Sequence, residues 1–136
     1  APLTPSHDAC CIDVAVCGAH LSGLPLNWQL TSRGARLRRT TTTAASYRLY
    51  ALPGGPPQRP GLLRVAEGGV AIEVEVWSVP AQQLGSFIDA IPAPLGIGRV
   101  HLADGSHVAG FVCEALGVTG AQDISALGSW RRFIAG

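Results

Sequence analysis

The chain has 136 residues, of which 47% are apolar and 14% charged, and its net charge is +1. This size and composition favour one globular domain with one core and exclude a disordered chain. The small net charge offers no field for nucleic acid, and no apolar run approaches the roughly 20 residues that span a bilayer, so neither nucleic acid nor a membrane is expected as a partner. With no signal peptide ahead of the first predicted strand, we expect a cytoplasmic protein.

The cysteines and the missing lysine restrict the chemistry. No lysine occurs, which excludes Schiff-base and lysine-nucleophile mechanisms. Cys10, Cys11, Cys17 and Cys113 lack the spacing of a disulfide framework, so reduced thiols are expected. Cys17 and His20 have a ligand-like spacing, but no second closely spaced pair accompanies them, and no metal site is predicted.

Residues 1–10 are expected to be a flexible N-terminal extension and residues 11–136 one domain. β-branched residues predict a first strand over 12–17, followed by a loop over 18–26 and a short helix that Asn27 caps and that ends near 33–34. Strands are predicted over 36–43, 47–52, 61–66 and 70–79, with a Pro- and Gly-rich loop over 53–60.

The remaining elements are a helix, a hairpin and a second helix. Pro80 is expected in the first turn of a helix over 80–90. Strands over 97–102 and 107–114 flank a turn at Asp104, and Asp123 is expected to cap the last helix. Roughly six or seven strands and about three short helices indicate an α+β fold built on a small, closed or nearly closed, mostly antiparallel β-barrel.

The loop after the first strand is the main candidate site. Small residues at Gly18 and Ala19 leave backbone N–H groups, with that of Leu21, free to bind an anionic oxygen. His20 titrates near neutrality in an ordinary environment, so it can donate a hydrogen bond to a carboxylate or a proton to nitrogen. The alternative is a partly exposed loop histidine without a function.

Four further residues are candidates for binding a ligand. Glu75 shares one strand face with Glu73, either as a solvated side chain or as a group that points into the pocket and orients His20 or a ligand. The Asn27 amide either caps the helix or reaches the ligand. Arg48, with the Tyr50 hydroxyl close by in the sequence, either pairs with a second carboxylate or forms an ordinary surface ion pair.

Several motifs carry a resemblance to a known family. A strand ending in a G-x-x-L loop, and the later Y-R-L-Y and A-D-G segments, resemble the gamma-glutamylcyclotransferase-like fold. A closer resemblance is to the C-terminal domain of allophanate hydrolase, and it extends from about Cys11 to Ile134. It rests on G-A-H-L-S-G-x-P-L-N, Y-R-L-Y-A-L-P, A-I-E-V-E-V-W, I-P-A-P-L-G-I-G and D-I-x-x-x-G-x-W.

This resemblance implies a function in urea and allophanate degradation. The family's amidase half releases ammonia from allophanate, and the C-terminal domain converts the resulting N-carboxycarbamate, a small dicarboxylate, to carbamate and carbon dioxide without a cofactor. The expected partners are that substrate and the amidase domain or subunit; a homodimer is left open. The chain lacks an amidase nucleophile motif and the catalytic glutamate that cyclotransferases place after the 80–90 helix, where Ile91 and Pro92 stand. The alternative is a non-catalytic dimerisation or substrate-binding module.

Overall fold

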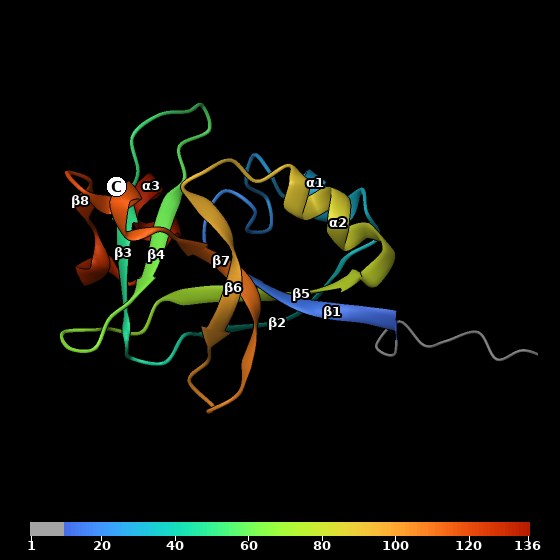
Figure 1. The fold of residues 1–136 in the computed structure, drawn as a ribbon, viewed down its shortest axis with the longest axis horizontal. Helices are drawn as coiled ribbons and strands as arrows, with labels where there is room; N and C mark the ends of the chain where they lie inside the picture. Colours follow the sequence, from blue (N-terminus) through green and yellow to red (C-terminus); the bar gives the residue numbers. More distant parts are fainter. Residues whose placement is uncertain (1–9) are drawn as a thin grey trace, which may run out of the picture.

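Two β-sheets and three short α-helices build the fold in the computed structural model, which describes residues 10–136 (Figure 1). The rest of the expected N-terminal extension, residues 1–9, lies outside the described residues. The strands are β1 Cys11–Val16, β2 Arg36–Thr42, β3 Tyr47–Ala51, β4 Pro60–Arg64, β5 Glu73–Pro80, β6 Leu95–His101, β7 His107–Cys113 and β8 Gln122–Asp123. The helices are α1 Trp28–Thr31, α2 Ala81–Asp89 and α3 Trp130–Ala135, with single 3₁₀ turns η2 Ala115–Val118 and η3 Ser125–Leu127.

The strands form a five-stranded sheet in the order β2-β5-β1-β7-β6 and a three-stranded sheet in the order β4-β3-β8. The pairing of β1 with β7 is parallel, with Val14 opposite Ala109, whereas the other named pairs are antiparallel. The predicted α+β class with few helices is therefore confirmed. The closed barrel is not observed, because β2 and β6 end the larger sheet and β3 pairs with β4 and β8 in a separate ladder.

The core lies between the larger sheet, the smaller sheet and α2. β1 and β5 lie inside the sheet order and are rich in valine, as expected for strands covered on both faces. The Tyr47 hydroxyl of β3 accepts a hydrogen bond of 2.9 Å from the His101 N–H of β6 and so joins the two sheets. The most deeply buried side chains include Val14, Val16, Leu49, Val74, Val76, Val79 and Phe87.

Several predicted boundaries need correction. β5 begins at Glu73 rather than at residue 70; Val70 forms an isolated bridge with Tyr47 instead. Pro80 ends β5 and precedes α2 in extended conformation, so it occupies the N-cap position and not the first turn.

The last helix also starts later than predicted. Asp123 lies in β8, and its carboxylate accepts a hydrogen bond from the Ser125 N–H, which stabilises the 3₁₀ turn η3. Ser129 caps α3, where its hydroxyl accepts a hydrogen bond from the Arg132 N–H. Gly128 lies between the 3₁₀ turn η3 and the helix α3 and adopts a left-handed conformation, with φ of 66°.

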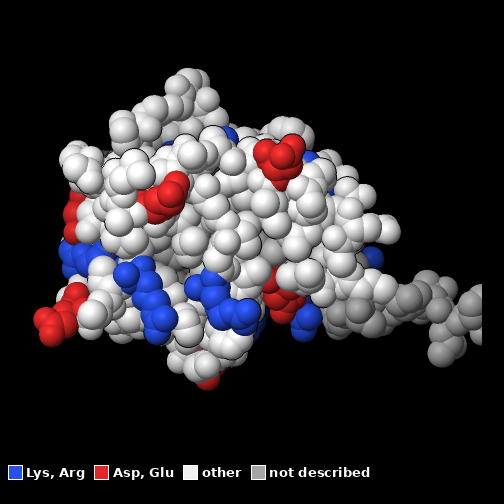
Figure 2. All heavy atoms as spheres, viewed as in Figure 1, with Lys and Arg blue, Asp and Glu red and all other residues white. Residues whose placement is uncertain are grey.

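The surface drawn in Figure 2 is mostly uncharged, with isolated basic and acidic side chains on it. Between residues 10 and 136, no helix has the length and apolar character needed to cross a bilayer.

Candidate functional site

The His20 loop, residues 17–27, leaves the end of β1 and turns back on itself before α1. The Leu21 N–H donates to the Gly18 carbonyl, and the Leu26 N–H donates to the Ala19 carbonyl. A Cβ atom at Gly18 would lie 2.3 Å from Cδ of Pro60, the first residue of β4. Glycine is thus required here because the loop and β4 approach each other closely.

His20 is buried, with 6% of its surface exposed. Its Nε2 lies 2.7 Å from Oε1 of Gln29, an atom that only accepts, so Nε2 carries the ring proton. The ring packs against Phe111 and Phe87 with centroid separations of 4.7 and 5.5 Å. Nδ1 has no hydrogen-bond partner within the described part of the chain and is not sealed from solvent, so it is the atom available to a ligand.

The environment of His20 makes its charged form unfavourable. Burial lowers its pKa from 6.5 to about 4; the hydrogen bond with Gln29 opposes this shift, whereas the positive charges of Arg59 and Arg33 add to it. Titration near neutrality, expected from the residue type, is therefore not found in the free protein, because the aromatic rings replace water around the imidazole. At neutral pH, His20 is uncharged and its Nδ1 accepts.

A small cavity of about 20 Å³ borders this ring. Its lining residues are Cys17, Gly18, Ala19, His20, Arg59, Pro60, Leu95 and Phe111. Among residues 10–136, the N–H groups of Gly18, Ala19 and His20 have no acceptor, whereas that of Leu21 is used within the loop. Leu21 itself is a core residue with 1% exposure. The expected anion-binding N–H groups are thus unpaired at Gly18 and Ala19 but not at Leu21.

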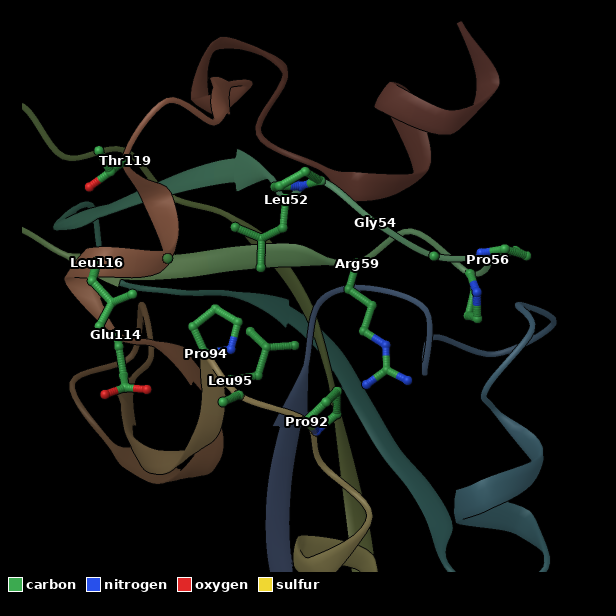
Figure 3. A pocket seen from close by; sticks show the side chains of 15 residues that line it. Leu52, Gly54, Pro56, Arg59, Pro92, Pro94, Leu95, Glu114, Leu116 and Thr119 are labelled. Atoms are coloured by element: carbon green, nitrogen blue, oxygen red, sulfur yellow. The ribbon is translucent and has the colours of Figure 1, made fainter.

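Arg59 is the cation of this site and was not predicted from the sequence. Its guanidinium forms no ion pair or hydrogen bond with the residues that the structure describes. It stands at the junction of the small cavity with a groove of about 720 Å³, since Arg59 and Leu95 line both (Figure 3). A half-buried arginine without a counter-ion, beside unpaired N–H groups, favours an anionic ligand.

Glu75 holds the His20 loop and does not line the cavity. Its carboxylate accepts hydrogen bonds from the Ser22 N–H at 2.8 Å, the Ser22 hydroxyl at 2.7 Å and the Trp77 indole at 3.0 Å. Arg131 of α3 donates to the same carboxylate and to the Ser22 carbonyl. Glu75 therefore fixes the chain two residues beyond His20. It is neither the solvated side chain nor the group inside the pocket that the sequence left as alternatives, because it is buried and does not line the cavity.

Asn27, too, has a positioning role in the loop. It makes no side-chain cap of α1; its amide Nδ2 donates to the His20 carbonyl at 2.8 Å. This bond fixes the backbone of His20 against the end of the loop, where Asn27 lies.

Arg48 and Tyr50 are not brought to the His20 loop. β3 alternates, so its buried Tyr47 and Leu49 face the core while Arg48 and Tyr50 face the other way. Two guanidinium nitrogens of Arg48 donate to Asp123 at 2.6 and 3.0 Å. Arg48 thus forms the surface ion pair that the sequence left open, and the period-two alternation of the strand is the physical reason.

The four cysteines carry free thiols. Burial raises the pKa of Cys17 to about 12, so its thiol is an inert part of the cavity wall. Between residues 10 and 136, no group of three or more His, Cys, Asp or Glu side chains is placed to hold a metal ion.

Comparison with known proteins connects this site to a family. The model of the allophanate hydrolase C-terminal domain matches residues 12–135. A urea amidolyase of Saccharomyces cerevisiae is 47% identical over 126 residues, which cover 90% of this chain and 7% of that relative. The chain therefore spans a small fraction of the length of the curated relatives it matches.

Solved structures agree with this result. An allophanate hydrolase of Kluyveromyces lactis is 45% identical with a TM-score of 0.91, covering 96% of this chain and 22% of that one. A uropathogenic E. coli-specific protein is 36% identical with a TM-score of 0.86, covering 92% and 96%. An AIG2-like protein of Mus musculus, 22% identical with a TM-score of 0.57, shares the fold alone. The resemblance drawn from the motifs and the expected fold class are thereby confirmed.

Proposed function

Because the chain belongs to the allophanate hydrolase C-terminal domain family, we propose that it binds N-carboxycarbamate and converts it to carbamate and carbon dioxide. The observation that carries this proposal is the unpaired Arg59 guanidinium beside the unpaired N–H groups of Gly18 and Ala19, next to a neutral, buried His20. This combination suits a small molecule with carboxylates on both sides of a nitrogen.

In the proposed complex, the substrate lies at the junction of the small cavity and the groove, where Arg59 binds one carboxylate and the N–H groups of Gly18 and Ala19 bind oxygens of the other. The substrate nitrogen then faces Nδ1 of His20, because Gln29 occupies Nε2. The dianion adds negative charge beside the imidazole, which raises its pKa and favours a proton on Nδ1.

The proposed step consumes one proton. Protonated Nδ1 donates its proton to the substrate nitrogen, which then no longer conjugates with the carboxylate that leaves. The bond between this nitrogen and the carboxylate carbon breaks, its electron pair stays on nitrogen, carbon dioxide departs, and carbamate remains. His20 returns to its neutral form and takes up the next proton from water when another dianion binds, and no cofactor takes part. One positioned general acid contributes about 10²–10⁴-fold to such a step.

The expected partner is an amidase domain or subunit that supplies the substrate, and we propose a cytoplasmic location for both. The coupled assay mixes the chain with the amidase part of a relative and measures carbon dioxide and ammonia release from allophanate. We expect His20→Asn and Arg59→Gln to lose the acceleration of carbon dioxide release while the first ammonia is released at an unchanged rate. Arg64→Gln, which removes an exposed arginine of β4, is the matched control.

Equal acceleration by the wild type and by His20→Asn would overturn the catalytic role of His20. Binding of malonate to the wild type without any acceleration would favour the substrate-binding module instead. A second copy of the chain as partner is tested by measuring its mass in solution.

A further inference from the structure

The groove beside Arg59 is much larger than the proposed substrate needs. N-carboxycarbamate has about seven heavy atoms and fills on the order of 100 Å³, judged from the ~30 Å³ that one water occupies in the liquid. The groove measures about 720 Å³, within the range of pockets that bind small molecules. The groove therefore has room for a ligand larger than the proposed substrate.

The walls of this groove are mainly apolar. Prolines line it on both sides, from the β3–β4 connection and from the segment before β6. Leu52, Leu95 and Leu116 add aliphatic surface, and Leu116 is 74% exposed at the rim, which is unusual for a large apolar side chain. Such walls favour a ligand part without charge.

The two charged side chains that line the groove lie apart. Figure 3 shows Glu114 and Leu116 together on one side of the groove and Arg59 toward its middle, with Pro94 and Leu95 between them and Pro56 beyond Arg59. A carboxylate is therefore attracted near Arg59, and a second anionic group is repelled on the Glu114 side. This polarity sets the direction in which a ligand lies.

We propose that the groove is a second subsite, which binds the apolar tail of a carboxylate whose head group sits at Arg59. It rests on the proposed function for the anion subsite and extends the ligand class to carboxylates that carry an uncharged aliphatic or aromatic substituent. The tail lies along Leu95 and reaches Leu116.

Calorimetry with four probes tests this assignment: malonate, butanoate, 4-phenylbutanoate and neutral 4-phenylbutanamide. We expect 4-phenylbutanoate to bind about tenfold more tightly than butanoate, because its ring leaves water for an apolar wall. Arg59→Gln should weaken both carboxylates about tenfold. Leu116→Ser, at an exposed position, should weaken 4-phenylbutanoate severalfold and leave malonate unchanged; Leu127→Ser, at another exposed leucine outside the groove, is the matched control.

Equal affinities for butanoate and 4-phenylbutanoate would overturn the tail subsite while malonate binding still supports the proposed function. Equal affinities for 4-phenylbutanoate and its amide would also overturn the assignment, because the groove would then accept any apolar group, including a protein segment. If malonate fails to bind but 4-phenylbutanoate binds and depends on both Arg59 and Leu116, the subsite stands and the proposed function fails.

Discussion

At the scale of the residue, the neutral form of His20 results from its surroundings and not from a charged partner. Two aromatic rings and a side-chain amide replace water around the imidazole, and the nearest charges are those of arginines. An anion bound in the cavity reverses this balance, because it screens Arg59 and attracts a proton to Nδ1.

We therefore expect malonate to raise the pKa of His20 from about 4 by about one unit or more. The measurement is an NMR titration of the ring protons with and without saturating malonate. Malonamide, which has the same shape and no charge, should leave the titration unchanged. A titration of His20 that malonate does not move would show that the dianion binds elsewhere.

Gly18 provides a second test at this scale. In Gly18→Ala the new Cβ would meet the Pro60 ring at 2.3 Å, so the loop or β4 must move. We expect a loss of about 1–3 kcal/mol in the free energy of unfolding, as for other overpacked sites, and weaker malonate binding. Gly96→Ala in β6 is the control, since its Cβ would meet nothing within 4 Å. Urea unfolding of both variants gives the comparison, and a stable Gly18→Ala that binds malonate normally would contradict the close packing.

At the scale of the element, the His20 loop is held from three directions. α1 supplies Gln29, β5 supplies Glu75, and α3 supplies Arg131. Although burial alone raises the pKa of Glu75, the hydrogen bonds from Ser22, Trp77 and Arg131 bring it below its ordinary value, so the carboxylate stays charged. The last helix of the chain thus helps to position a loop that follows the first strand.

Glu75→Gln should release this loop without filling or opening the core. We expect a cost of about 2–4 kcal/mol in unfolding free energy, because the substitution removes a largely buried charge that accepts four hydrogen bonds, one from Arg131. Faster hydrogen exchange at the Ser22 amide is the readout that separates loop release from general destabilisation. Glu67→Gln, at an exposed position, is the control, and unchanged exchange at Ser22 would refute the anchoring role of Glu75.

The sequence predicts elements that local patterns determine better than features that depend on contacts between segments far apart in the chain. The alternating sequences of β3 and β5 predicted both strands. In β3 the alternation also matches burial, whereas in β5 both faces are buried, which the alternation does not predict. The parallel pairing of β1 with β7 and the open sheet edges depend on contacts between distant segments, and no local pattern encodes them. The start of α3 was misplaced because Asp123 and Ser129 are both good caps and only packing decides between them.

The same distinction applies to the site. Gly18, Ala19 and His20 could be proposed from the sequence because a small-residue loop after a buried strand is visible in it. Arg59 was missed because it lies in a Pro- and Gly-rich segment, and it reaches the cavity only through the packing of Pro60 on Gly18.

At the scale of the whole molecule, the buried His20 links folding to pH. The unfolded chain binds a proton at His20 with a pKa near 6.5, whereas the folded protein does so only near 4. Between these values the unfolded state binds more protons, so stability falls as the pH falls through this window and levels off below about pH 4. Above pH 6.5 both states are neutral at this residue, and His20 adds no pH dependence.

His20→Gln removes this group and should flatten the stability profile. From pH 7 to pH 5, the wild type should lose about 2 kcal/mol of unfolding free energy more than the variant, as the two pKa values require. The carboxylates with lowered pKa values, Glu75, Asp104 and Asp123, begin to lose their contributions only as the pH falls below their ordinary pKa values of 4.5 for Glu and 3.8 for Asp, which lie below the range from pH 7 to pH 5. Urea unfolding at both pH values provides the measurement. Packing changes caused by His20→Gln shift stability equally at both pH values and cancel in the comparison. Parallel profiles for the wild type and His20→Gln would mean that the imidazole is not held neutral, and the malonate-induced rise in its pKa would then lose its physical basis.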